Sequence, residues 1–503
     1  MTGVRVACAL LIAASAVGVP IEARTVCTGL ARLALPAASI TLAQDVAAGA
    51  FALPDAAPTK AARALPAFCR VAATLKPTAA SDIKIEVWLP ASGWTGRFQA
   101  VGNGAFSGAI AYPAMMTALA RGDVAASTDT GHVGGSASFA LDSAERLTDF
   151  GWRAVHEMTV AAKRLIAAHY QTPVEYAYWN GCSAGGRQGM KEAQQFPADF
   201  DGIVAGSPGL DWTSRATQAV RVAKVLENNP AGRLTPPLLQ LLHRGVLDAC
   251  DPLDGATDGL IENPERCAFE PAVLQCRAGA SASCLTPAQV QTARLMYSSP
   301  KNPKSGREIT GLAPGSELGW TDLGWSASAR ATGLDQFRYI VFKNPSWTIQ
   351  QFEFDRDVVR AEETDANTIN ALEPNLKAFL ARGKLLQYHG WSDPQISPLN
   401  STQYYRRVVG AMGGVANVDS AYRLFMVPGM AHCRGGEGPD TFDALGALER
   451  WVEQGIAPDR LLASHSANGV VDRTRPLCAF PKVAVYQGRG SLDDAANFVC
   501  QTQ

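Results

Sequence analysis

The residues around Ser183 have the types and spacing of a nucleophilic serine site. Gly181-Cys182-Ser183-Ala184-Gly185 matches the pattern G-x-S-x-G, between residues expected to form a strand and residues expected to form a helix. Small residues on both sides of a serine allow a sharp turn that exposes its hydroxyl. The motif alone is weak, since it also describes an ordinary glycine-rich turn with a solvated serine. Its setting between strand and helix predicts a nucleophile.

A serine nucleophile needs an imidazole base and a carboxylate that orients the base. In a strand–turn–helix architecture the expected chain order is Ser, then Asp or Glu, then His. His432 follows an expected strand, and His389, its main competitor for the role of base, lies at the end of another. Asp393 lies four residues beyond His389, where the alternative is a plain turn residue before proline. We predict Ser183, Asp393 and His432 as the catalytic residues.

Attack on a carbonyl creates an oxyanion that needs N–H donors. Ala184 begins the helix expected after the serine, and Gly104 lies in a Gly-Asn-Gly turn after an earlier expected strand. We predict these two residues as the oxyanion hole. The chemistry requires no redox cofactor.

Strands that alternate with helices are expected to position these side chains. This alternation predicts an α/β fold with a mainly parallel sheet covered on both faces. The Ala- and Pro-rich residues 24–80 are expected to wrap around it. The expected strands are 83–90, 97–101, 124–131, 174–181, 203–205, 384–390 and 422–429, and the expected helices are 152–169, 187–195 and 442–454.

Strand signals are sparse over residues 210–375. The chain therefore divides into an α/β domain in two parts, 24–209 and 376–503, and an inserted lid over 210–375. Two consecutive domains are the alternative. The insertion is favoured because Ser183 and His432 come from opposite sides of the interruption.

Charge and the N-terminus restrict partners and compartment. Lys and Arg number 45 against 46 Asp and Glu, a net charge of −1, which argues against a nucleic-acid binder that relies on phosphate neutralisation. Arg5 followed by the apolar run 6–19 is typical of a signal peptide, expected over residues 1–23. A buried helix or membrane anchor is the alternative. We expect a secreted or periplasmic protein that has no membrane contact after cleavage.

The chain has eleven cysteines, and Cys8 lies in the expected signal peptide. The remaining ten are an even number, as expected for disulfides in an oxidising compartment. Cys182 and Cys433 flank the predicted nucleophile and base, so a bridge between them would hold the two loops together. Zinc is disfavoured because no C-x2-C pair occurs. Short loops suggest the other pairs: Cys27–Cys69, Cys250–Cys267, Cys276–Cys284 and Cys478–Cys500.

An acidic loop follows Cys250. Asp251, Asp254 and Asp258, with the carbonyls of Ala256 and Leu260, could supply the oxygen ligands that calcium requires. A solvated turn is the alternative.

The sequence resembles the tannase and feruloyl esterase family of α/β-hydrolases, which includes the enzyme that hydrolyses mono(2-hydroxyethyl) terephthalate. The resemblance covers nearly the whole chain after the signal peptide and rests on three motifs, at 179–209, 388–398 and 427–436. It implies the Ser183–Asp393–His432 triad, the five disulfides named above, and a structural calcium ion in the lid on the acidic loop.

The resemblance also implies a secreted serine carboxylesterase that acts through an acyl-enzyme on small esters of hydroxycinnamic, hydroxybenzoic or gallic acids. Ile396 and Ala184 stand where the terephthalate-active relative has an aromatic and an acidic residue, so weak activity on terephthalate monoesters is expected. The alternatives are a hydrolase of terephthalate monoesters within the same family, a secreted serine peptidase and a non-catalytic binding protein. Aromatic residues of 320–354 would line the substrate pocket or fill the lid's own core. The sequence specifies neither the preferred acyl group nor the oligomeric state.

Overall fold

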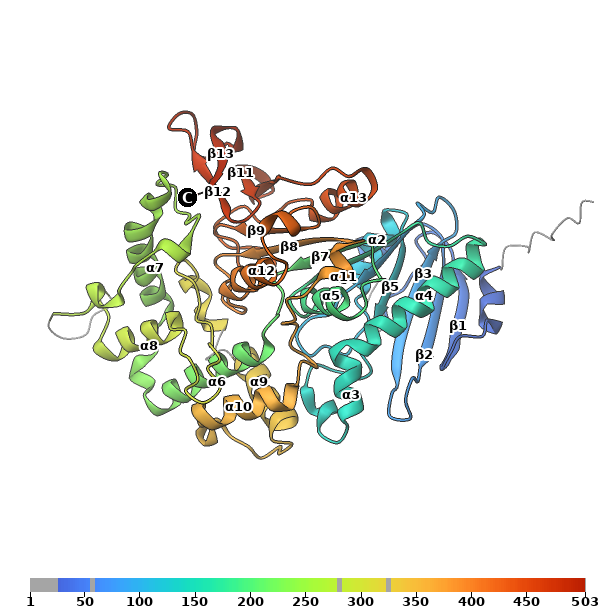
Figure 1. Ribbon diagram of the computed structural model, residues 1–503, viewed down its shortest axis with the longest axis horizontal. Coiled ribbons are helices and arrows are strands. Elements are labelled where there is room, and N and C mark those ends of the chain that lie inside the picture. Colours follow the sequence, from blue (N-terminus) through green and yellow to red (C-terminus); the bar gives the residue numbers. More distant parts are fainter. Residues whose placement is uncertain (1–25, 55–58, 278–282, 323–326, 503) are drawn as a thin grey trace, which may run out of the picture.

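A computed structural model of the chain describes residues 26–54, 59–277, 283–322 and 327–502 (Figure 1). The expected signal peptide, 1–23, lies outside the described residues. No helix among the described residues is long and apolar enough to cross a membrane.

A nine-stranded sheet in the order β1-β2-β3-β5-β4-β6-β7-β8-β9 forms the centre of the molecule. The strands from β5 to β9 run parallel, whereas β1, β2 and β3 are antiparallel to their neighbours. The predicted parallel core is thus confirmed. The strands are β1 (Ala38–Val46), β2 (Phe68–Leu75), β3 (Ile83–Pro90), β4 (Arg97–Val101), β5 (Val124–Thr128), β6 (Tyr176–Cys182), β7 (Gly202–Gly206), β8 (Lys384–Gly390) and β9 (Tyr422–Val427).

The expectation that residues 24–80 wrap around the domain is wrong. They form β1 and β2, which extend the sheet at one edge (Figure 1). Alanines at the centre of β2 weaken the alternation of large apolar and polar residues that identifies a strand in a sequence.

Helices cover both faces of the sheet because the buried side chains alternate along its strands. Leu385 packs with one face and Leu386 with the other. Burial of such a side chain stabilises the fold by about 1.5–3 kcal/mol. The first face carries α4 (Ala154–Tyr170), α5 (Ala184–Gln195) and α12 (Leu399–Ala411), and the second carries α2 (Tyr112–Ala120) and α13 (Ala444–Gln454).

Residues 207–383, here called the inserted segment, connect two neighbouring strands, since β7 pairs directly with β8. In Figure 1 the segment lies beside the sheet, in green to yellow-orange. Its described residues contain no strand. Its helices are α6 (Trp212–Asn228), α7 (Pro236–Cys250), α8 (Pro287–Tyr297), α9 (Ala327–Asp335), α10 (Phe354–Asp365) and α11 (Lys377–Leu380). The division into a hydrolase domain and a lid over 210–375 stays a prediction.

The inserted segment has its own apolar clusters. Trp320, Phe337, Trp347 and Phe352 are buried within them, each at most 3% exposed. These aromatic residues therefore stabilise the segment and are not an open pocket wall.

The remaining elements are small. Two hairpins near the C-terminus, which the sequence patterns did not predict, consist of β10 (Arg460–Ala467) with β11 (Val470–Cys478) and β12 (Lys482–Tyr486) with β13 (Phe498–Thr502). Two short helices are α1 (Lys60–Arg63) and α3 (Ala144–Thr148). Short 3-10 turns lie at Cys27–Arg32, Ala137–Ala140, Pro230–Gly232, Asp251–Asp254, Pro264–Arg266, Pro271–Leu274, Glu317–Asp322, Ile349–Gln351, Val415–Asn417 and Ala495–Asn497, and π-helical turns at Asp149–Arg153 and Gln336–Val341.

Candidate active site

Ser183 occupies a strained turn between β6 and α5. Its backbone angles are φ 63° and ψ −123°, a region that residues with a side chain rarely adopt. The strain is tolerated because the flanking backbones touch. A Cβ added to Gly181 would lie 2.5 Å from the carbonyl carbon of Gly185, so position 181 requires glycine. The turn presents residue 183 at the carboxyl end of β6, as the motif predicts.

His432 and Asp393 lie on the loops that follow β9 and β8 and are joined by a hydrogen bond. His432 Nδ1 and Asp393 Oδ2 are 2.6 Å apart. The other carboxylate oxygen, Oδ1, accepts the backbone N–H groups of Gln395 and Ile396 at 2.8 and 2.9 Å. Since β6, β8 and β9 are parallel strands of one sheet, the loops that carry Ser183, Asp393 and His432 leave the same edge.

The surroundings of Asp393 keep it ionised. Burial alone would raise the pKa of this carboxyl group, which has no solvent exposure. The charge of His432 and hydrogen bonds from His389 and His432 outweigh burial and hold the pKa below its usual value. An ionised Asp393 accepts the Nδ1 proton of His432 and leaves Nε2 of that ring as the basic nitrogen, the tautomer that a serine nucleophile requires.

A disulfide joins the two loops that carry the predicted nucleophile and base. Cys182, directly before Ser183, is bonded to Cys433, directly after His432, and their Cα atoms are 6.1 Å apart. The predicted pairing is confirmed here and at the four local bridges, Cys27–Cys69, Cys250–Cys267, Cys276–Cys284 and Cys478–Cys500. The covalent link restricts how far the loops of Ser183 and His432 can separate.

The two predicted oxyanion donors come from segments in mutual contact. Ala184 is the first residue of α5, where the backbone N–H has no acceptor within the helix. The turn before Gly104 lies against the same helix, because a Cβ on Gly102 would come 2.4 Å from the Cα of Gly185. Asn103 donates its own N–H to Gln188 Oε1 at 3.0 Å. The N–H of Asn103 is therefore already used in a hydrogen bond. The roles of Ala184 and Gly104 as oxyanion donors stay predictions.

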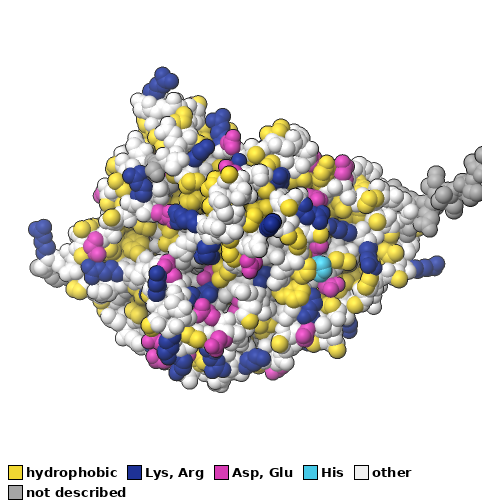
Figure 2. Space-filling model, viewed as in Figure 1, with side chains coloured by type: hydrophobic (Ala, Val, Ile, Leu, Met, Phe, Trp, Pro, Cys, Tyr) yellow, Lys and Arg dark blue, Asp and Glu magenta, His cyan; other side chains and the backbone are white. Residues whose placement is uncertain are grey.

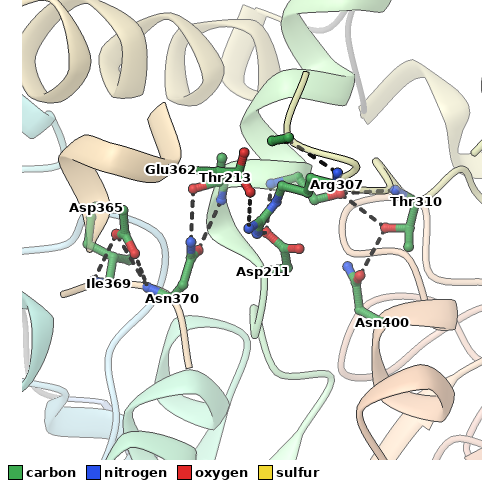
Figure 3. Close-up of polar contacts among 11 residues, drawn as sticks. Asp211, Thr213, Arg307, Thr310, Glu362, Asp365, Ile369, Asn370 and Asn400 are labelled. Carbon is green, nitrogen blue, oxygen red and sulfur yellow. Dashed lines mark hydrogen bonds and ion pairs between the residues drawn. The ribbon is translucent and has the colours of Figure 1, made fainter. Parts of the chain in front are cut away.

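Hydrogen bonds and ion pairs fasten the inserted segment where it leaves and rejoins the sheet (Figure 3). Asn370, on the returning chain, accepts the N–H of Thr213 at 3.1 Å and donates to its hydroxyl at 2.9 Å. Arg307 forms ion pairs with both Asp211 and Glu362. These contacts hold the base of the segment next to the start of α6, close to the end of β7.

A cleft of about 560 Å³ lies beside the catalytic loops, on the side of the sheet covered by α2 and α13. Its walls include Cys182, Cys433, Gln99, Tyr388 and Arg434 but neither Ser183 nor His432. The cleft therefore borders the two cysteines of the disulfide, which are the chain neighbours of Ser183 and His432.

The carboxylates of the acidic loop accept hydrogen bonds from nearby backbone N–H groups: Asp251 from Asp258 and Gly259, and Asp254 from Ala256 and Glu262. Asp251 and Asp254 are 4% and 8% exposed, and Ala256 and Leu260 are also buried. Burial, together with the charges of Asp251 and Asp258, raises the pKa of Asp254 to about 6. Asp258 also forms an ion pair with Arg475. Carboxylates and backbone carbonyls are the donor types that suit calcium, but Asp251, Asp254 and Asp258 do not form a group whose ligand atoms all lie within 4.8 Å of one another.

Among the described residues, one group of histidine and carboxylate side chains has ligand atoms that all lie within 4.8 Å of one another, namely His156, Glu192 and Asp199. His156 Nδ1 and Asp199 Oδ2 are hydrogen-bonded at 2.6 Å, and the ring of His156 stacks on Phe196. Burial raises the pKa of Glu192 well above its usual value. These contacts pack His156 of α4 against the segment that carries Phe196 and Asp199.

The fold and the site define the class of the protein. The serine lies on a strained turn after β6, the aspartate follows β8 and the histidine follows β9. These three strands are parallel and are covered by helices. This is the arrangement of an α/β-hydrolase.

Comparison with known proteins defines the family. Residues 69–501 match the family model "Tannase and feruloyl esterase". The chain is 36% identical to an uncharacterized esterase of Xanthomonas campestris pv. campestris, over 99% of this chain and 95% of that protein. It is 33% identical to a probable feruloyl esterase B-2 of Aspergillus fumigatus, over 86% of each chain. The chain belongs to the tannase and feruloyl esterase family and is a carboxylic ester hydrolase.

Solved structures agree with this assignment. Feruloyl esterase B from Aspergillus oryzae superimposes with a TM-score of 0.89 at 32% identity, over 94% of this chain and 99% of that one. A tannin acyl hydrolase from Aspergillus niger has a TM-score of 0.70 at 20% identity, over 93% of this chain and 92% of that one, and supports the fold alone.

Proposed function

We propose that this carboxylic ester hydrolase is a secreted or periplasmic serine esterase that cleaves esters of aromatic carboxylic acids. The observation that supports the mechanism most strongly is the 2.6 Å hydrogen bond between His432 and an ionised Asp393. The disulfide between Cys182 and Cys433 links this pair to the strained turn of Ser183.

The reaction proceeds in two steps through an acyl-enzyme. His432 Nε2 takes the proton of the Ser183 hydroxyl, the Ser183 oxygen attacks the ester carbonyl carbon, and the same proton passes to the leaving alcohol. Water then repeats the sequence and releases the acid. The N–H groups of Ala184 and Gly104 stabilise the oxyanion in both steps. Asp393 holds the His432 ring and stabilises its charged form.

The acyl group is aromatic, in line with relatives named feruloyl esterase. Terephthalate monoesters are poor substrates, because Ile396 and Ala184 replace the aromatic and acidic residues of the terephthalate-active relative. Ile396 is 3% exposed, and its N–H is committed to Asp393. The segment over 210–375 acts as a lid, and calcium on Asp251, Asp254, Asp258, Ala256 and Leu260 stabilises it.

Five disulfides agree with an oxidising compartment. On the face seen in Figure 2, basic and acidic side chains are interspersed, with no extended basic surface that would suit a nucleic acid.

A hydrolysis panel tests this function. Methyl ferulate, methyl gallate, chlorogenic acid and mono(2-hydroxyethyl) terephthalate are compared with the amide of ferulic acid, using the wild type and Ser183→Ala. We expect turnover of at least one hydroxycinnamate or gallate ester, little turnover of the terephthalate, and none of the amide. Ser183→Ala should lower kcat by several orders of magnitude. Faster cleavage of the amide than of every ester would indicate a peptidase. If none of the compounds is cleaved, the result would indicate a non-catalytic binding protein.

A further inference from the structure

A buried chain of side-chain hydrogen bonds ends on the carboxylate of Asp393 and is not used by the mechanism above. Its members come from β8, β9, α12 and the loop after β8, and none of them has any solvent exposure. In order they are Tyr422, Gln387, Ser401, His389 and Asp393.

The direction of every hydrogen bond follows from the end nearest the active site. His389 Nε2 lies 3.2 Å from Asp393 Oδ2 and 3.1 Å from the carbonyl oxygen of Ile396. Carboxylates and carbonyls accept only, so Nε2 carries a proton. In the neutral ring Nδ1 is then an acceptor, and the Ser401 hydroxyl, 2.7 Å away, must donate to it.

The rest of the chain is consistent with that direction. Since the Ser401 hydroxyl donates to His389, its lone pairs are free to accept the Gln387 side-chain N–H, which lies 2.6 Å away. The amide oxygen of Gln387 in turn accepts the Tyr422 hydroxyl. The three middle members, Gln387, Ser401 and His389, each both donate and accept, which fixes one tautomer of a buried imidazole.

The fixed tautomer has a consequence for Asp393. Its oxygen Oδ1 is held by two backbone N–H groups, and Oδ2 receives both His389 and His432. The carboxylate therefore cannot rotate away from His432. The groups that act electrostatically on Asp393 are His432, His389 and the buried guanidinium of Arg215. Of these, only His389 is held by a chain of neutral side chains.

We propose that His389 is a positioning residue for catalysis: as a neutral imidazole whose Nε2 proton is fixed by Ser401, Gln387 and Tyr422, it holds Asp393 Oδ2 toward His432. This role rests on the proposed Ser183–His432–Asp393 mechanism. By donating to the oxygen shared with His432, His389 also reduces the negative charge that this oxygen presents to the His432 ring.

The test uses four variants of the full chain with a small aryl ester as substrate. His389→Leu removes the donor, and His389→Gln keeps an N–H near the position of Nε2. Ser401→Ala interrupts the chain with a small change that the fold is expected to tolerate. Thr402→Val is the matched control, since its hydroxyl is equally buried on α12 but bonds Glu265 and the Leu399 carbonyl. The readouts are kcat, KM, the pH profile of kcat/KM and the melting temperature.

His389→Leu should lower kcat about tenfold, because the orienting carboxylate is no longer fixed, with little change in KM. It should also move the acid limb of kcat/KM to higher pH, because the Asp393 carboxylate, without the hydrogen bond from His389, presents more negative charge to the catalytic imidazole. Ser401→Ala should do the same to a smaller extent. His389→Gln should restore most of kcat and the position of the acid limb, and Thr402→Val should match the wild type.

The proposal is overturned if His389→Leu and Ser401→Ala fold and lower only the melting temperature while kcat and the acid limb stay as in the wild type. If His389→Leu does not fold, the proposal is decided by comparing Ser401→Ala with Thr402→Val in kcat and in the position of the acid limb. Ser183→Ala is run in parallel. Retained activity in Ser183→Ala would refute the proposed function itself. If Ser183→Ala is inactive while Ser401→Ala keeps the kcat and the acid limb of the wild type, only the role of His389 is refuted.

Discussion

Removal of the Cys182–Cys433 bridge should destabilise the protein far more than removal of a local bridge, and should also slow catalysis. The bridge spans a sequence separation of 251 residues, against 8 for Cys276–Cys284. In the chain-entropy treatment a bridge stabilises mainly by restricting the unfolded chain, and these separations correspond to about 5.5 and about 2.5 kcal/mol. The expected difference between the two variants is therefore about 3 kcal/mol.

The assay compares Cys182→Ser/Cys433→Ser with Cys276→Ser/Cys284→Ser. Guanidinium unfolding gives the free energy of unfolding, and steady-state kinetics on an aryl ester gives kcat. Without the first bridge, the loops of Ser183 and His432 are tied only by noncovalent contacts, so kcat should fall by about a hundredfold. The second pair lies in the inserted segment and should leave kcat nearly unchanged. Equal losses of stability together with an unchanged kcat in the first variant would refute the reasoning.

Three further predictions concern other parts of the molecule. Calcium added to chelator-stripped protein should raise the melting temperature measured by calorimetry, and Asp254→Asn should reduce that gain; no calcium-dependent gain in the wild type would argue against the site. Burial raises the pKa of Glu192, so the folded state retains its proton and loses stability as pH rises through that pKa. Thermal melts of Glu192→Gln should therefore show a gain over the wild type that grows with pH, and a gain largest at acid pH would contradict this. Arg307→Gln leaves Asp211 and Glu362 without their partner and should lower the free energy of unfolding by about 3 kcal/mol. Addition of Asp211→Asn should cost less than the sum of the single changes, and strict additivity would exclude the coupling.

The features that could be predicted from the sequence are those encoded by short, local patterns. The turn of Ser183 depends on small residues within two positions of the serine. β3, β4 and β8 have the bounds expected from their apolar residues. The disulfide pairs were predictable because four of them close short loops and the fifth flanks two predicted catalytic residues.

The features that were missed depend on tertiary contacts. The C-terminal strands β10 and β11 expose apolar residues such as Leu462, Val470 and Val471, so their sequences lack the regular apolar–polar alternation of a half-buried strand. In the sequence His389 competes with His432 as a base, because His389 lies near the end of β8 and His432 lies on the loop after β9. Only the side-chain geometry shows that Ser401, from α12, engages Nδ1 of His389 and that His432 has the short contact with Asp393. The contacts of Arg307 with Asp211 and Glu362 likewise join positions far apart in the chain.

The most direct test of the central claim is peptide mapping by mass spectrometry after reaction with a fluorophosphonate. A serine activated by His432 and Asp393 should form one covalent adduct, on the peptide that contains Ser183, with loss of esterase activity in proportion to labelling. The adduct should be absent from Ser183→Ala and should form much more slowly in His432→Ala. An adduct on another residue, or full esterase activity in protein labelled at Ser183, would contradict the assignment of Ser183 as the nucleophile.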